Sequence, residues 1–223
     1  MFLVVIEKVA DTTWMIVVAF IVQGLCFQYF STLRESIAAV AAQNVEEFDA
    51  ANTDATAAAA FAGTITPPDY RFGYTYEELY EFYDAIGEEG CVLYQRHAMV
   101  DLFPYMQSYA LVGGAFLLQQ LRPLKLNTKI ALIFPMAMMM DMLETCIPAY
   151  GCNIYPRKLK HEAVEAAAAA NKLKWTQFGI GMVLLSVLFV YNSVRPPAPS
   201  QTTTSSETDT TAEGNASNTK KNN

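Results

Sequence analysis

Apolar residues along this chain gather in long runs that are separated by polar segments. The run at 12–33 contains no charged residue over 22 positions, and the runs at 102–121 and 175–194 contain none over 20. A helix needs about 20 residues to cross a bilayer core about 30 Å thick, because each residue adds about 1.5 Å. These three runs therefore predict transmembrane helices.

A fourth run, at 130–150, has the length of a span but carries two acidic residues, Asp141 and Glu144. An Asp at the centre of a spanning helix costs roughly 2.5–3.5 kcal/mol on insertion scales. A span that keeps two carboxyl groups three residues apart is therefore a functional-site hypothesis by default. We interpret this run as the third of four spans and its acids as candidate ligand-binding residues.

The polar segments complete the expected architecture. Residues 34–97 would form a long acidic loop, and residues 196–223 have too few apolar side chains to form a core, which is typical of a disordered tail. The N-terminus and first span occupy 1–33, and the other three spans lie within 98–195. The predicted fold is all-α: a four-transmembrane-helix bundle with an amphipathic helix in its first loop.

That amphipathic helix is expected at about residues 76–86. Thr75 and Glu78 have the spacing of a capping box, Gly87 is a suitable C-cap, and apolar residues between them recur on one face. The helix would lie on the membrane surface or on the bundle. A second helix would start near Glu88 and continue into the second span.

The net charge of −7 is unevenly distributed. Twelve acidic residues and three arginines lie between positions 31 and 97, whereas the rest of the chain is slightly basic. An acidic surface argues against nucleic acid as a partner. Membrane lipids are the expected surroundings, and no motif in the sequence indicates a cofactor.

Polar side chains on all four predicted spans fall in the same half of the membrane. Asp141 would lie about 18 Å from Lys129, and Tyr109 about 20 Å from Arg122, along their helices. On the second span, polar residues recur every four positions and so share one face. This polar layer comprises Gln23, His97, Asp101, Tyr105, Tyr109, Asp141, Glu144 and Gln177.

Three interpretations of the polar layer remain open. Its hydrogen bonds could only stabilise the bundle of a tetraspan scaffold, or the layer could bind a small or lipidic ligand. In the third interpretation, Asp141 and Glu144 are the acid/base pair of an intramembrane lipid-modifying enzyme. With two histidines in the chain, a histidine-rich metal centre is not expected. We expect a binding protein rather than an enzyme.

Three of the four cysteines, Cys91, Cys146 and Cys152, fall at one end of the predicted bundle. A bridge from Cys91 to Cys146 or Cys152 would connect the second and third spans, and we take Cys91 and Cys152 as the candidate pair. Free thiols packed as small apolar groups are the alternative. No Cys-x-x-Cys motif is present, so a thioredoxin-like relay is not expected.

The last four residues, Lys220-Lys221-Asn222-Asn223, resemble the dilysine signal that retrieves eukaryotic membrane proteins to the endoplasmic reticulum. Coat-type retrieval machinery reads such a signal from the cytosol. We therefore expect an integral membrane protein of the endoplasmic reticulum or early secretory pathway with a cytosolic tail and a lumenal acidic loop. Basic residues near the span ends divide five to seven between the two sides and do not decide the orientation.

Motifs between residues 72 and 145 resemble those of a widespread family of small four-span membrane proteins that has no assigned activity. The family pattern is Gly-Tyr-Ser/Thr, then Gly-x-x-Gly-Arg-x-x-Tyr, then Asp-x-x-Phe/Leu-Pro-x-x-Tyr entering a span, and Asp-x-x-Glu-Asn in the next span. The matching residues are Gly73-Tyr74-Thr75, Gly87-Glu-Glu-Gly90-Cys91 with Tyr94, Asp101-Leu-Phe-Pro104-Tyr105, and Asp141-Met-Leu-Glu144-Thr145. Cys91 stands where the family has arginine, and Thr145 where it has asparagine. The resemblance implies the four-span fold more than a function.

Overall fold

The computed structural model describes residues 1–49 and 67–194, and every regular element within these ranges is helical. The all-α class is therefore confirmed. Residues 50–66 of the expected first loop lie outside the described residues. So does the predicted disordered tail with the candidate targeting residues Lys220 and Lys221.

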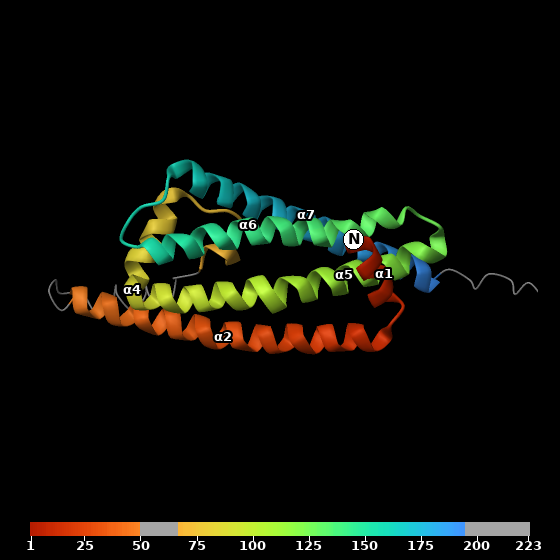
Figure 1. The fold of residues 1–223 in the computed structure, drawn as a ribbon, viewed down its shortest axis with the longest axis horizontal. Coiled ribbons are helices and arrows are strands. Elements are labelled where there is room, and N and C mark those ends of the chain that lie inside the picture. Colours follow the sequence, from red (N-terminus) through yellow and green to blue (C-terminus); the bar gives the residue numbers. More distant parts are fainter. Residues whose placement is uncertain (50–66, 195–223) are drawn as a thin grey trace, which may run out of the picture.

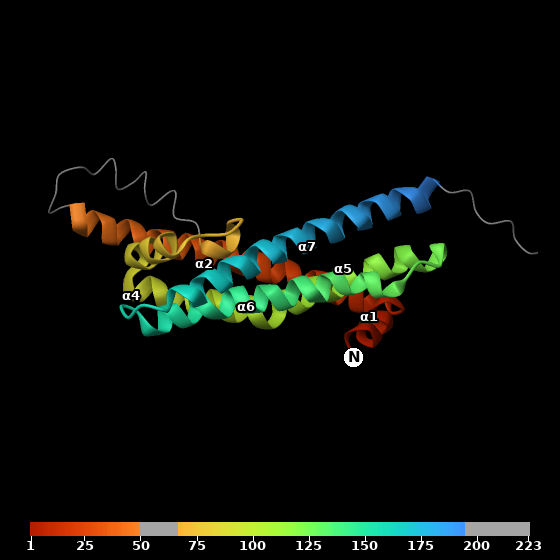
Figure 2. The same cartoon turned by 90° about the horizontal axis from the view of Figure 1, so that it is seen from above.

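The long helices run side by side along the molecule (Figure 1), with α5 and α6 between α2 and α7. Figure 2 shows that α7 crosses α6 obliquely and diverges from it toward its C-terminal end. The helices are α1 (Phe2–Ala10), α2 (Thr13–Asp49), α4 (Tyr76–Val100), α5 (Met106–Leu121), α6 (Ile133–Ile154) and α7 (His161–Val194). The short elements are the 3₁₀ turns η1 (Pro68–Tyr70), η3 (Arg122–Leu124) and η4 (Thr128–Leu132), and the π-helical turn η2 (Asp101–Tyr105).

Helix α4 begins and bends where its sequence predicts. The Glu78 amide donates to the Thr75 hydroxyl at 3.2 Å, and the Thr75 amide donates to the Glu78 carboxylate at 2.7 Å. This reciprocal capping box satisfies two backbone donors that the first helical turn leaves unpaired. At Gly87 the backbone leaves the helical region with φ 61°, a conformation that is costly for residues with a side chain. The predicted pair of helices on either side of Gly87 is therefore confirmed.

The first helical part of α4 packs on the bundle, which is one of the two positions expected from the sequence, the other being the membrane surface. Its apolar residues Leu79, Phe82 and Ile86 are buried in a cluster that includes Ile37 of α2 and Val164 of α7. Helix α2 reaches this cluster because it continues to Asp49, well beyond the predicted end of the first span. Part of the long acidic loop is thus an extension of the first helix.

The other end of the bundle is closed by α1, an element that the sequence did not predict. Its residues Ile6 and Val9 are buried against Leu117 and Leu121 of α5. The Asp11 carboxylate at the end of α1 forms an ion pair with Arg122, which fixes α1 to the turn after α5. The two ends therefore have separate cores, and the middle of the bundle connects them.

Between α4 and α5 the helix passes through the π turn η2, which contains Pro104. Proline has no amide hydrogen, so it removes one rung of the helical ladder and favours a local bulge. The Gln107 side chain donates to the Leu102 carbonyl at 2.7 Å and satisfies an acceptor within the bulge. Asp101, the first residue of this turn, is buried.

Among the described residues, three helical segments are long and apolar enough to cross a membrane: Thr13–Asn44, Thr128–Ile154 and His161–Val194. Many large apolar side chains on α2 and α7 are exposed, as expected for a surface in contact with lipid. The segment expected as the second span is divided between η2 and α5, which has 16 residues. It does not reach the length of a span as a separate helix.

Candidate functional site

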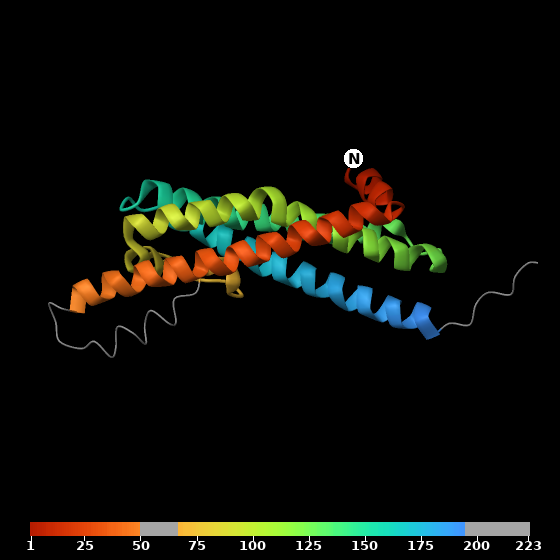
Figure 3. The same ribbon diagram turned by 90° about the horizontal axis from the view of Figure 1, so that it is seen from below.

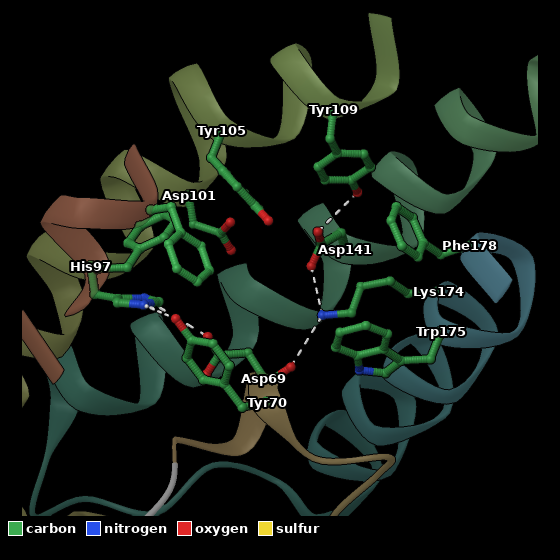
Figure 4. A pocket seen from close by; sticks show the side chains of 12 residues that line it. Asp69, Tyr70, His97, Asp101, Tyr105, Tyr109, Asp141, Lys174, Trp175 and Phe178 are labelled. Atoms are coloured by element: carbon green, nitrogen blue, oxygen red, sulfur yellow. Dashed lines mark hydrogen bonds and ion pairs between the residues drawn. The ribbon is translucent and has the colours of Figure 1, made fainter. Parts of the chain in front are cut away.

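A pocket of about 250 Å³ lies in the middle of the bundle, bordered by α2 and α7 with α5 and α6 behind it (Figure 4). Its border includes two apolar side chains that are accessible from outside the bundle. Phe27 of α2 is 68% exposed, and Trp175 of α7 is 38% exposed. Figure 3 shows the side of the bundle on which α2 lies nearest to the viewer, with α7 diverging from it toward the C-terminal end of α7. Asp69 and Tyr70 of η1 lie on the side of the pocket opposite Tyr105 and Tyr109 (Figure 4).

The centre of the site is a buried ion cluster. The Lys174 ammonium lies 2.9 Å from Asp141 Oδ1 and 2.9 Å from Glu144 Oε2, and it also donates to the Asp69 carbonyl at 3.4 Å. The three charged side chains are 9%, 7% and 0% exposed. A lone buried charge is strongly destabilising, whereas a paired and hydrogen-bonded one is tolerated. Lys174 therefore explains how α6 carries two carboxylates on one face.

Each acid of the pocket also connects helices through a neutral donor. The Tyr109 hydroxyl of α5 donates to Asp141 Oδ2 at 2.9 Å, and the Thr145 hydroxyl of α6 donates to Asp101 Oδ2 at 3.1 Å. Hydrogen bonds to charged groups contribute more than neutral ones, about 1.5–3 kcal/mol. Thr145 thus provides a polar link between α6 and Asp101 of η2.

A second polar group lies at the η1 side of the pocket. The Tyr94 hydroxyl donates to Asp69 Oδ1 at 3.3 Å, and the Tyr70 hydroxyl lies 3.2 Å from His97 Nε2. Burial lowers the pKa of His97, while the nearby Asp69 carboxylate opposes that shift. An imidazole with a lowered pKa is neutral at pH 7, so His97 adds no positive charge to the pocket.

Aromatic rings form most of the remaining wall. Phe30 of α2 packs on His97 and Tyr105 at centroid distances of 4.5 and 5.1 Å. Phe178 of α7 packs edge-on against Tyr109 at 5.9 Å. Such edge-to-face pairs add about 0.5–1.5 kcal/mol beyond their buried area. The rings therefore give the pocket a fixed shape as well as an apolar surface.

The polar layer expected from the sequence is only partly assembled here. His97, Asp101, Tyr105, Tyr109 and Asp141 line the pocket, and Glu144 lies behind it against Lys174. The half-buried Gln23 lies beside the Tyr105 hydroxyl without lining the pocket. Gln177 is not a lining residue, and among the described residues its buried Oε1 has no hydrogen-bond partner.

Sequence reasoning missed the residues that complete the site, which are Asp69, Tyr70, Lys174, Trp175 and the phenylalanines Phe27, Phe30 and Phe178. Lys174 directly precedes the charge-free run at 175–194 that predicts the fourth span. Counted from Arg195 along a helix, Lys174 lies about 31 Å deep, about 13 Å beyond Asp141. The sequence nevertheless contained a signal for Lys174, because two acids in one span require a cation within reach.

The candidate disulfide residues Cys91 and Cys152 are both buried in the cluster around α4, and their thiols are in contact. Both are free in the structure. In the part of the chain that the structure describes, no three His, Cys, Asp or Glu side chains converge on a point that could hold a metal ion.

Comparisons with other proteins add no relative, since no family model, curated protein or solved structure matches this chain.

Proposed function

We propose that this protein is a four-span integral membrane protein that binds a lipidic ligand in the pocket between α2 and α7. The observation that carries this proposal is the position of the pocket. Its border consists of exposed aromatic side chains on two helices with apolar outer surfaces, and its interior holds buried charges. An apolar cavity with a few fixed polar groups is the usual form of a ligand site.

The three long apolar helices would be joined by a further span, second in sequence order, which is the helical segment from the π turn to Leu121. Helix α5 alone has 16 residues, but η2 connects it to α4 without a break in the helical chain. Residues 101–121 together would extend about 30 Å, the thickness of a bilayer core. In this arrangement the pocket lies near the lumenal surface, where the apolar spans meet the extensions of α2, α4 and α7.

The alternatives receive less support. In the enzyme interpretation, Asp141 and Glu144 must exchange protons with a substrate, yet both bind Lys174 at 2.9 Å and Asp141 also accepts from Tyr109. The ion cluster does stabilise the bundle, as the scaffold interpretation requires. A scaffold alone, however, gives no reason for a cavity of about 250 Å³ beside the cluster, because unfilled space costs packing energy.

We propose residence in the endoplasmic reticulum or early secretory pathway, with Lys220 and Lys221 on the cytosolic side. The support is the dilysine-like end of the sequence, which coat-type retrieval machinery would read. The pocket would then face the lumenal leaflet, and its ligand would enter from that leaflet.

Native mass spectrometry of the protein purified in a mild detergent tests ligand binding. We expect one bound lipidic species per chain in the wild type, and loss of this species in Trp175→Ala, which removes a ring of the pocket. Trp14→Ala is the matched control, because Trp14 is 66% exposed on α2 and does not line the pocket. Equal occupancy in the wild type and both variants, or no bound species at all, would contradict the proposal.

A further inference from the structure

We infer that the ligand of this pocket is a lipophilic cation, namely an ammonium group attached to an apolar tail. The inference rests on the proposed function, because it assigns a chemical class to the ligand of the same site. It depends on the charge balance of the pocket, on one carboxylate with a free oxygen, and on the arrangement of the rings.

The carboxyl groups around the pocket outnumber the cations. Asp69, Asp101 and Asp141 line it and Glu144 lies directly behind it, whereas Lys174 is the one lysine or arginine among the described lining residues. The Lys174 ammonium already has two carboxylates at 2.9 Å and a carbonyl at 3.4 Å. It has little remaining capacity to bind an anion, and the other polar groups that a phosphate or sulfate would meet are mainly carboxyl groups.

Asp101 is the carboxylate left available for a ligand. It is 5% exposed, and its side chain points into the space between Tyr105 and Asp141 (Figure 4). Among the described residues, its side chain receives one hydrogen bond, from Thr145 to Oδ2. Its other oxygen has no hydrogen-bond donor among the described residues but is not fully buried, so it is accessible from the pocket. A cationic group in the pocket would supply that oxygen with a partner.

The rings of the pocket suit the same class of ligand. An ammonium group is attracted to the face of an aromatic ring within about 6 Å of its centre, and aromatic cages are the recurrent site for such groups. The pocket already holds one ammonium in this way, since Lys174 Nζ lies 5.2 Å from the centre of the Trp175 ring. Seven of the lining side chains in the described part of the chain are aromatic.

The size of the pocket indicates how such a ligand would lie. A cavity of about 250 Å³ is smaller than the roughly 300–1,000 Å³ of sites that enclose a drug-sized molecule. It is suited to a head group, while an alkyl tail would leave past Phe27 and Trp175 along the apolar sides of α2 and α7. The absence of a three-residue metal site in the described chain further favours an organic cation over a metal ion.

Fluorescence titration distinguishes this class of ligand from others. In the variant Trp14→Phe, Trp175 is the only remaining tryptophan of the two in the chain and reports on the border of the pocket. The protein in dodecyl maltoside is titrated with octyltrimethylammonium, octyl sulfate and octyl glucoside, which share one tail. We expect a saturable change of Trp175 emission with octyltrimethylammonium at the lowest concentration.

Two further variants test whether Asp101 is the carboxylate that binds the ammonium group. Asp101→Asn keeps the shape and can still accept from Thr145, so it should fold, and we expect the ammonium probe to bind about tenfold more weakly. Glu35→Gln removes a negative charge from an exposed position of α2 outside the pocket and should leave the affinity unchanged. If Asp101→Asn does not fold, the order of the affinities of the three probes for the Trp14→Phe protein still tests whether the ligand is a cation.

Each outcome has a defined meaning. Tighter binding of octyl sulfate or octyl glucoside, or an Asp101→Asn variant with unchanged affinity for the ammonium probe, would overturn the cation assignment and leave the pocket as a binding site for another class. A linear, unsaturated response to all three probes would overturn the cation assignment too, and together with empty wild-type protein in native mass spectrometry it would refute ligand binding as such.

Discussion

Replacing Lys174 with methionine should destabilise the protein severely. The methionine side chain fills a similar space, but it removes the ammonium that lies 2.9 Å from both Asp141 and Glu144. These two carboxylates are 7% and 0% exposed, so water cannot take over the role of the lysine. One oxygen of Glu144 already lacks a hydrogen-bond partner among the described residues, and the substitution would leave the other without its ion pair.

The size of the effect follows from this burial. Removing one partner of a buried ion pair costs about 3–5 kcal/mol, since it leaves an uncompensated buried charge. For a chain of this length, each kcal/mol lowers the melting temperature by about 2–4 °C, which gives a decrease of roughly 6–20 °C. Lys172→Met is the matched control on the same helix. Lys172 is exposed, so its replacement should change stability by no more than about 0.5 kcal/mol.

Thermal unfolding in dodecyl maltoside, followed by circular dichroism, measures the effect. The triple variant Lys174→Met, Asp141→Asn, Glu144→Gln removes all three charges together and should recover most of the lost stability, because replacing a whole buried ion cluster is often close to neutral. A Lys174→Met protein as stable as the Lys172→Met control would refute the buried cluster. So would a triple variant no more stable than Lys174→Met alone.

Two further predictions concern packing and covalent structure. Gly113→Ala should destabilise the bundle by about 1–3 kcal/mol, because an added Cβ would lie 2.6 Å from the Phe134 ring. Gly179→Ala, which meets no atom within 4 Å, should be neutral or slightly stabilising in the same melting assay. Cys91 and Cys152, which are in contact, should form a disulfide in protein isolated from the secretory pathway. Alkylation of the denatured, unreduced protein followed by intact mass measurement should then modify two of the four cysteines.

The opposite results are equally clear. Equal melting temperatures for the two glycine variants would contradict the close contact of α5 with α6 near Phe134. Modification of all four cysteines without a reductant would show that the contacting thiols are free, packed as small apolar groups.

Much of the local structure could be predicted because its causes lie close together in the sequence. The capping box of Thr75 and Glu78 spans four residues, and the bend at Gly87 depends on the backbone freedom of that residue. Long apolar runs predict long helices for the same reason, and α2, α6 and α7 confirm this. The helix α1 was missed because a short helix is stabilised by its contacts with α5 rather than by its own sequence.

By itself, the sequence determined that the chain is all-helical, that two acids lie on one face of α6, and that Asp101, Tyr105 and Tyr109 share a face of the neighbouring helix. Only the tertiary structure decided what these acids do. Asp141 lies 13 residues before the last residue of α6 (154 − 141) and Lys174 lies 13 residues after the first residue of α7 (174 − 161), so the packing of these two consecutive helices brings them level. Depth counted from Lys129 and from Arg195 places them about 13 Å apart, because it assumes that those two residues lie at the same level. The pocket exists because the packing of α6, α7 and η1 brings residues that are distant in sequence to one place.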